Sequence, residues 1–360
     1  MKKFYFTPGP SQLYFTANEH LKSALKKDIP SISHRSATFQ KIVEEVTENL
    51  KIMFNLGDHH DVFFMSSANE IWERIIENTV QSESFHLVNG AFSNRFRKIA
   101  TELGVNALSA EAEYGKVVDI EKLLVPESVE LMAITQNETS TGASQPVDDI
   151  YSLRSAFPNQ LLAVDMVSSA PYVNIDFEKV DTAYFSVQKC FGLPAGLGVW
   201  ITNDKCIEAC HRKLDKGKSI GSYHSLPVLK EKAVKNQTPE TPNVLALYLL
   251  NGVVKDMLTK GLDMIRRETD YKAAVLYHAV NDSEVLEPFV ADDRHKSKTT
   301  IVAKSHIGSA PVIDSFAKRG LILGAGYGDF KNDHLRIANF PTHSKEHIEY
   351  IADELIKIRQ

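Results

Sequence analysis

Short runs of consecutive apolar residues alternate with amphipathic stretches between about residues 60 and 200. The apolar runs predict buried strands, because strands of a parallel sheet are covered on both faces. They are VFFM (62–65), FHLVN (85–89), LMAIT (131–135), LLAVD (161–165), AYFS (183–186) and LGVWIT (197–202). Between the earlier runs, ANEIWERIIENTV and SNRFRKIATEL show helical patterns. This alternation predicts an α/β fold with a mostly parallel sheet covered by helices.

The pattern changes in the last third of the chain. A helix is expected over about 243–260, ending at Gly261, and a second over about 263–280. Residues 298–360 then predict strand, helix, strand, strand, helix, which is a small α+β domain. A chain of 360 residues, 43% of them hydrophobic, is long for one core. We expect a large domain over 1–250 and a small one over 251–360, with the N-terminal segment as a candidate to pack on the small domain.

Composition narrows the functional classes. The net charge of -5 argues against a nucleic-acid-binding protein. The N-terminus lacks the apolar run of a signal peptide, and no stretch approaches the roughly 20 apolar residues of a membrane span. Three cysteines suit a reducing cytoplasm. Cys206 and Cys210 lack further convergent ligands, and His59–His60 is expected to be a solvated polar loop, so we expect no metal.

One acid and one lysine follow neighbouring strand patterns. Asp165 ends an apolar strand, and Lys189 lies between a strand and a turn rich in glycine and proline. Ligands of parallel sheets bind at the carboxyl ends of the strands. A lysine that forms an imine and a carboxylate that protonates a ring nitrogen are what pyridoxal phosphate needs. Taken singly, each residue is more often a surface lysine or a turn-forming aspartate.

Three further polar or glycine-rich segments follow strands. They are SSANE (66–70), NGAFS (89–93) and QNETSTG (136–142). Small residues at a helix N-terminus expose N–H groups that hold phosphate, although Ser67 and Glu70 also match a structural capping box. Phe92 is a candidate to stack on a flat ring, although such an aromatic is often core. Five such segments in consistent order favour a cofactor site.

Several motifs resemble those of the class V aminotransferases. They are PGPS (8–11), ISHRS (32–36), NET (137–139), VDMVSS (164–169), QKCFGLPAGLGV (188–199), QTPETPN (237–243) and LRIANFP (335–341). Within that class, the chain is most similar to the phosphoserine aminotransferases. The resemblance implies fold type I, pyridoxal phosphate as cofactor, and transamination between an amino acid and a 2-oxo acid. By resemblance, serine biosynthesis is the expected pathway.

The resemblance also implies roles for individual residues. Lys189 would carry the cofactor as a Schiff base and act as the general base, and Asp165 would pair with the ring nitrogen. The implied cofactor contacts within the chain are Ala68, Asn69, Phe92, Thr139, Ser168 and Gln188.

Other implied residues bind substrate or reach a second subunit. Arg336 resembles the arginine that binds the substrate α-carboxylate, a task suited to guanidinium. His34 and Arg35 resemble the pair that meets the substrate phosphate or distal acid. Gln237 and Thr238 resemble a segment that crosses to the partner's cofactor phosphate. These residues imply a two-fold homodimer with shared active sites.

The chain also departs from the phosphoserine aminotransferase pattern. That family has a second His–Arg pair shortly before the carboxylate-binding arginine, but residues 326–334 read GYGDFKNDH. Lys331 and His334 are candidate substitutes. An alanine– or serine–glyoxylate aminotransferase is therefore the alternative substrate assignment, and a cofactor-free paralogue is the non-enzymatic one. A dinucleotide-binding loop at 321–330 is disfavoured, because a strand rather than a helix is expected after it.

Overall fold

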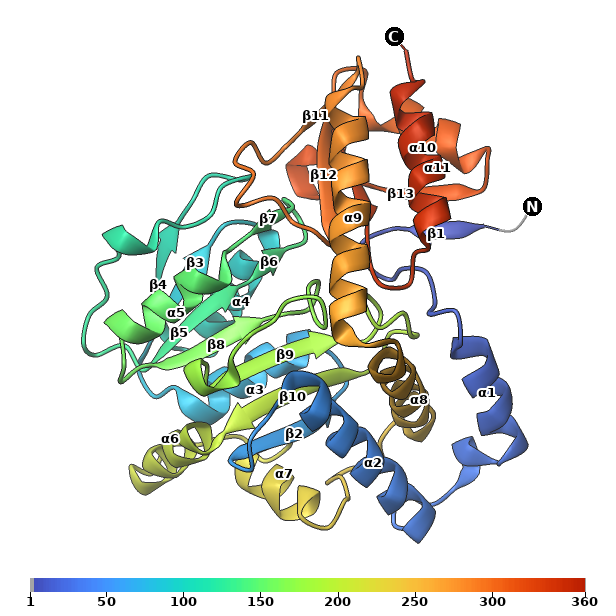
Figure 1. The fold of residues 1–360 in the computed structure, drawn as a ribbon. Coiled ribbons are helices and arrows are strands. Elements are labelled where there is room, and N and C mark those ends of the chain that lie inside the picture. The colour runs from blue at the N-terminus through green and yellow to red at the C-terminus, as the bar shows by residue number, and fades with distance from the viewer. Residues whose placement is uncertain (1–2, 360) are drawn as a thin grey trace.

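The computed structural model describes residues 3–359, which build two large β-sheets and a two-stranded sheet of β6 (Asn137–Glu138) and β7 (Ala143–Ser144) (Figure 1). The larger sheet has the strand order β2–β10–β9–β8–β5–β3–β4. Its strands are β2 (His60–Met65), β3 (Glu83–Val88), β4 (Asn106–Glu111), β5 (Leu131–Thr135), β8 (Leu161–Asp165), β9 (Thr182–Ser186) and β10 (Gly198–Asn203). Neighbours are parallel except where β10 is involved. The mostly parallel sheet predicted from sequence is confirmed.

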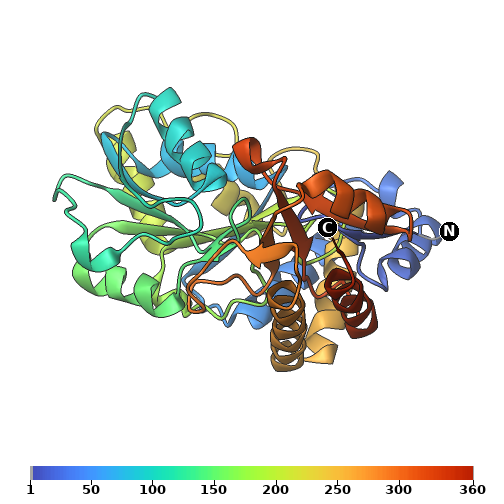
Figure 2. The same ribbon diagram turned by 90° about the horizontal axis from the view of Figure 1, so that it is seen from above.

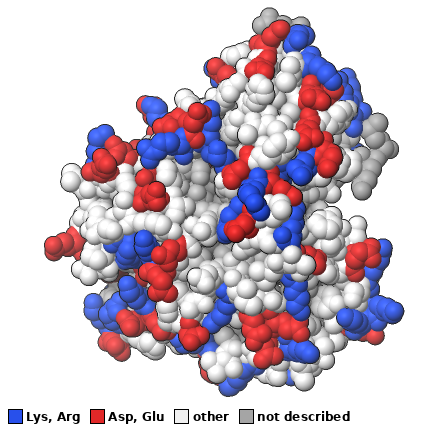
Figure 3. Space-filling model, in the orientation of Figure 1, with Lys and Arg blue, Asp and Glu red and all other residues white. Residues whose placement is uncertain are grey.

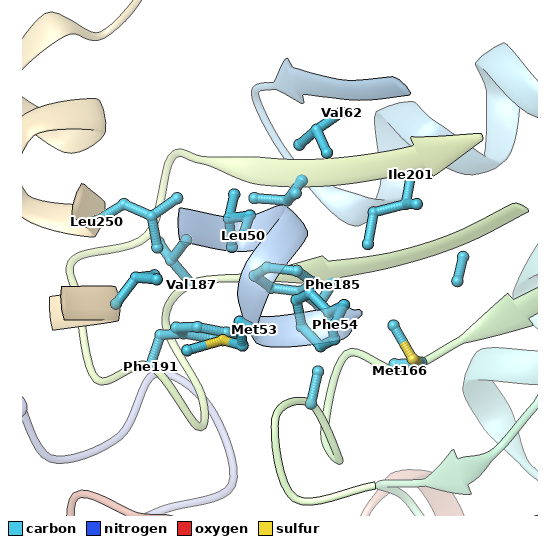
Figure 4. Packing of buried hydrophobic residues seen from close by; sticks show 14 of the residues in the cluster. Leu50, Met53, Phe54, Val62, Met166, Phe185, Val187, Phe191, Ile201 and Leu250 are labelled. Atoms are coloured by element: carbon cyan, nitrogen blue, oxygen red, sulfur yellow. The ribbon is translucent and has the colours of Figure 1, made fainter. Parts of the chain in front are cut away.

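Helices cover both faces of this sheet. One face carries α2 (Ala37–Phe54), α5 (Val147–Ala156) and α8 (Val244–Lys260), and α1 (Ala17–Lys26) packs on α8. The other carries α3 (Ala68–Thr79), α4 (Ala91–Glu102), α6 (Asp204–Asp215) and α7 (Leu226–Ala233). Side chains alternate between the two layers. Phe185 packs on Phe54 and Phe191 (Figure 4), whereas Tyr184 belongs to the core of the opposite layer. Burial on both faces explains the continuous apolar runs.

The smaller sheet has the order β1–β13–β14–β12–β11. Its strands are β1 (Phe4–Phe6), β11 (Leu286–Pro288), β12 (Thr300–Ser305), β13 (Leu321–Ala325) and β14 (His334–Ala338). They pack with α9 (Leu262–Asn281), α10 (Ser309–Ala317) and α11 (Lys345–Ile356) in a core of their own. β1 pairs in parallel with β13, so the N-terminal segment joins this sheet. β13 is followed by a short 3-10 turn and β14, which excludes the strand–turn–helix of a dinucleotide-binding loop.

The chain passes from one sheet to the other at Gly261. Gly261 is both the C-cap of α8 and the N-cap of α9. Its φ of 87° favours glycine. α8 packs on the large sheet, and α9 lies beside α11 against the small one (Figures 1 and 2). The boundary expected near residue 250 remains a prediction.

The visible surface shows acidic and basic side chains interspersed (Figure 3). This agrees with the small net charge of -5 and with the absence of a basic excess in the sequence. Within residues 3–359, no helix combines the length and the apolar character needed to cross a membrane.

Candidate active site

A pocket opens where the carboxyl ends of the large-sheet strands face the small sheet. Its lining comes from the segments after five strands, from the N-terminal segment and from the small sheet. The lining residues are Pro8, Gly9, Ser67, Ala68, Asn69, Trp72, Phe92, Thr135, Asn137, Thr139, Asp165, Val167, Ser186, Gln188, Lys189, Tyr327 and Arg336. Eight of the residues singled out from sequence therefore meet in one place: Ala68, Asn69, Phe92, Thr139, Asp165, Gln188, Lys189 and Arg336.

Lys189 projects into this pocket just after β9. Its side chain is only 7% exposed, and its Nζ donates to the Thr139 hydroxyl at 2.8 Å. The same Nζ lies 5.1 Å from the centre of the Phe92 ring. Burial lowers the pKa of Lys189 to about 8, against the opposing attraction of Asp165 and Glu138. A lysine of this kind is partly neutral near pH 7.5 and can act as a nucleophile or base.

Asp165 is the last residue of β8, and it is buried beside this lysine. One carboxylate oxygen accepts the Val167 N–H at 2.8 Å. Burial raises the pKa of Asp165 to about 6, although Val167 and Lys189 act in the opposite direction. A buried carboxylate this poorly compensated favours a cationic or N–H-bearing ligand in the pocket.

The first turn of α3 forms another wall. Ser67 caps this helix by accepting the Glu70 N–H, which is half of the expected capping box. The other half does not form, because the Glu70 carboxylate accepts the N–H of Ser66 instead of that of Ser67. The Ala68 N–H donates to the Ser186 hydroxyl at 2.9 Å, which leaves the Asn69 N–H without a partner among residues 3–359. An open N–H at the positive end of a helix suits a phosphate group.

Glu138 fixes the position of Phe92, and the sequence analysis did not assign it a role. This fully buried carboxylate accepts the Ser93 N–H at 2.9 Å and the Ser93 hydroxyl at 3.0 Å. It also accepts the Ser140 hydroxyl at 2.6 Å. An acid at the first turn of α4 is favoured by the helix dipole, so Glu138 holds the turn that presents the Phe92 ring. The position of Glu138 in the NET motif, just after a buried strand, was the sequence feature that could have indicated this role.

The small sheet contributes the opposite wall. Arg336 on β14 donates from Nε to the Ala325 carbonyl at 2.8 Å, and burial lowers its pKa to about 10. Its guanidinium carbon lies 5.3 Å from the centre of the Tyr327 ring. The Tyr327 ring packs on the Phe92 ring, with 5.2 Å between the two ring centres. Tyr327 thus bridges the two sheets over the pocket. His334 is buried against Phe289 rather than in the pocket lining.

The remaining residues expected from sequence lie elsewhere in this chain. Ser168 exchanges hydrogen bonds with Asn137 at 2.8 Å and is absent from the pocket lining. Arg35 donates to the Gln237 side chain and the Thr238 carbonyl, both at 2.9 Å. His34 is the neighbour of this arginine. Arg35, Gln237 and Thr238 therefore form a second group outside the pocket lining. We call these three residues, together with the adjacent His34, the outer cluster.

Two groups considered for metal binding lie apart from the pocket. Cys206 and Cys210 are buried among the apolar side chains of the α3 layer, as ordinary packing predicts. Nitrogen or oxygen atoms of His59, His60 and Glu178 lie within 4.8 Å of one another. His60 begins β2 at the end opposite the pocket, and its Nε2 faces the Phe177 carbonyl at 3.2 Å. The expectation of a solvated loop is wrong for His60, which is buried as part of the strand.

Comparison with known proteins identifies relatives along the whole chain. The family model described as aminotransferase class-V matches residues 7–327. A crystal structure of a phosphoserine aminotransferase from Cytophaga hutchinsonii is 46% identical, with a TM-score of 0.97 and 98% of each chain covered. A phosphoserine aminotransferase from Rhodococcus opacus is 28% identical over 97% of this chain and 93% of its own. An alanine–glyoxylate aminotransferase from Nostoc shares the fold, with 20% identity, a TM-score of 0.81, and 99% of this chain and 95% of its own covered.

Proposed function

The chain belongs to the class V aminotransferases, and we propose that it transfers the amino group of phosphoserine to 2-oxoglutarate with pyridoxal phosphate as cofactor. The observation that carries this proposal is the buried pair of Lys189 and Asp165 in one pocket. The high similarity to the Cytophaga phosphoserine aminotransferase supports the choice of substrate. A cofactor-free paralogue would have no use for a buried lysine beside a buried acid, since both cost desolvation energy.

The pocket residues fit the groups of pyridoxal phosphate. Asp165 would hold a proton on the ring nitrogen, and the attraction of that cation would compensate its buried charge. Phe92 would cover one ring face, and Thr139 would meet the ring hydroxyl. Asn69 has an open N–H for the phosphate at the start of α3. The cofactor supplies an electron sink for the charge that develops when the substrate loses its α-proton.

Lys189 and Arg336 would handle the reacting part of the substrate. Arg336 would bind the α-carboxylate, since its guanidinium is held at the pocket wall by the Ala325 carbonyl. Lys189 Nζ would take the proton from the substrate α-carbon and return it to the adjacent carbon of the cofactor. Its lowered pKa near 8 leaves a useful fraction neutral at physiological pH. Phe92 and Tyr327, in contact above the pocket, would exclude water.

The outer cluster is proposed to serve the pocket of a second subunit. It gathers His34, Arg35, Gln237 and Thr238, which family resemblance assigns to the substrate's distal group and the partner's cofactor phosphate. All four lie outside the pocket lining of their own chain, and Arg35 binds the 237–239 segment directly. A two-fold homodimer would bring each cluster to the opposite pocket.

We also propose a cytoplasmic location. Cys190, Cys206 and Cys210 are all free, buried thiols. Burial raises the pKa of Cys210 to about 11, which keeps this thiol protonated and unreactive. Free cysteines of this kind are typical of a reducing compartment.

A spectroscopic titration tests the function. Cofactor-loaded protein is mixed separately with phosphoserine, glutamate, alanine and serine, and the absorbance of the lysine-bound cofactor is followed. We expect saturable loss of that band with phosphoserine and glutamate. Arg35→Gln should raise the half-saturating phosphoserine concentration roughly tenfold or more while keeping the band.

The other outcomes have distinct meanings. Conversion by alanine or serine but not phosphoserine would identify a glyoxylate-type aminotransferase, with the missing second His–Arg pair as the reason. Protein that never forms the lysine-bound band would be the cofactor-free paralogue. Lys189→Ala is the blank, because it can bind the cofactor only without a covalent bond.

A further inference from the structure

A buried histidine lies between two carboxylates beside the pocket. His224 is 3% exposed, its Nδ1 lies 2.5 Å from Glu70 Oε1, and its Nε2 lies 2.8 Å from Glu240 Oε2. Carboxylates only accept hydrogen bonds, so both ring nitrogens must carry a proton. The ring is therefore an imidazolium. Its backbone has a φ of 53°, an uncommon conformation for histidine.

Glu70 ties this imidazolium to the pocket. It belongs to the first turn of α3, directly after Ala68 and Asn69, which line the pocket. Its second oxygen accepts the Ser66 N–H at 2.8 Å and the Ser66 hydroxyl at 2.6 Å. The carboxylate thus fixes the turn that precedes α3. It also places a negative charge close to the proposed phosphate position.

Glu240 ties the same imidazolium to the outer cluster. The Thr238 hydroxyl donates to the Glu240 carbonyl at 2.8 Å. Arg35 donates to Gln237 and to the Thr238 carbonyl. One charged ring therefore connects the start of α3 with the segment expected to serve the partner's pocket.

Other contacts hold the loop around His224 without its charge. Arg74 Nη1 donates to the Tyr223 carbonyl at 2.9 Å, and the Leu226 N–H donates to Asn78 Oδ1 at 2.8 Å. Arg74 and Asn78 lie one and two turns beyond Glu70 on α3. These two hydrogen bonds tie the loop to α3 without the imidazolium. Removing the charge of His224 should therefore leave the loop in place.

We propose that His224 is a positioning residue whose imidazolium links Glu70 and Glu240 and offsets their charge beside the cofactor phosphate. The proposal rests on the proposed function, because it takes pyridoxal phosphate as the ligand of the pocket. With a neutral side chain at position 224, two carboxylates would face each other and repel a phosphate dianion at the start of α3. The segment 237–240 would also lose its ionic tie to α3.

The groups facing the ring set its titration. They are Glu70 from α3, Glu240 from the segment after α7, and the Tyr223 ring, whose centroid lies 3.9 Å from that of His224. Arg74 from α3 donates to the Tyr223 carbonyl. Burial opposes the charge, but the hydrogen bonds to Glu240 and Glu70 outweigh it and raise the pKa of His224 to about 9. The link is therefore intact near neutral pH and is lost as the pH rises through about 9.

The test measures pyridoxal phosphate affinity and dimer mass from about pH 7 to pH 10. His224→Asn removes the charge with a residue that tolerates the same backbone conformation. His211→Asn, on the exposed side of α6, is the matched control. We expect His224→Asn to weaken the cofactor about tenfold near pH 7, while His211→Asn matches the wild type. The ratio of the cofactor affinities of the wild type and His224→Asn should then fall towards one as the pH passes about 9.

An affinity ratio near one at pH 7, or one that stays constant with pH, would overturn the proposal. If His224→Asn fails to fold, Glu240→Gln decides. The cofactor affinity of Glu240→Gln should fall at a lower pH than that of the wild type, because one attraction that raises the pKa of His224 is gone. An unchanged pH profile overturns the link. Wild-type protein that takes up no pyridoxal phosphate would instead remove the proposed function and this inference with it.

Discussion

The titration of Lys189 gives a quantitative test of the pocket. With a pKa of about 8, the amine is about 3% neutral at pH 6.5, half neutral at pH 8 and about 90% neutral at pH 9. The rate at which apoprotein joins pyridoxal phosphate covalently should follow this fraction, since only the neutral amine attacks an aldehyde. It should rise about 30-fold from pH 6.5 to pH 9 and then level off. An ordinary lysine would be only about 3% neutral at pH 9, and its rate would keep rising.

Two variants should move this inflection in opposite directions. Asp165 favours the protonated form of Lys189, whereas Arg336 disfavours it. Asp165→Asn should therefore shift the inflection to lower pH, and Arg336→Gln should shift it to higher pH. The assay is stopped-flow absorbance of the lysine-bound cofactor, with Lys189→Ala as the blank for non-covalent binding.

The direction of the shifts decides this prediction, because either variant can also change the absolute rate through lost cofactor contacts. A rate that rises without levelling through pH 9 would show that burial does not lower the lysine pKa. Shifts of the same sign in both variants would refute the charge arrangement read from the structure.

Two further predictions concern residues that hold the site in place. Glu138→Gln should lower the free energy of unfolding in urea by about 3 kcal/mol, because donors at the start of α4 lose a buried carboxylate. Glu102→Gln, at the exposed end of α4, should leave the free energy of unfolding nearly unchanged. Equal effects of the two substitutions would contradict the capping role. Gly9→Ala should slow covalent cofactor attachment roughly tenfold or more without unfolding the protein, because its Cβ would lie 2.9 Å from Lys189 Cε, while Gly217→Ala, with open space around it, should not. A Gly9→Ala rate equal to wild type would refute the close approach.

The sequence pattern predicted the large sheet well because its strands are buried on both faces. It missed β4, whose residues NALSAE are only partly buried at the sheet edge. It also missed β1 and β11, each three residues long and too short to show a period. Strands of this kind form because a neighbouring strand offers hydrogen bonds, and that partner lies far away in the sequence.

Pocket residues, like strands, could be predicted where their position follows from chain order, but not where it depends on contacts between distant segments. Asp165 and Lys189 follow strands of one parallel sheet, so chain order alone brings them to one edge. Tyr327 arrives from the other sheet, and its contact with Phe92 depends on how the two sheets pack. The role of Glu138 depends on its contact with Ser93 in the first turn of α4, and Ser93 lies 45 residues earlier in the chain.

The arrangement of charge divides the recognition of a substrate between two places. The cations that line the pocket are Lys189 and Arg336, and we propose that both act at the reacting end of the substrate. A distal phosphate needs further cations, and Arg35 is already oriented by the 237–239 segment at a site outside its own pocket. In the proposed homodimer, discrimination between phosphoserine and alanine would then depend on the second subunit. Conditions that separate the subunits should therefore reduce activity with phosphoserine more than covalent attachment of the cofactor, because Lys189 and Asp165 come from one chain.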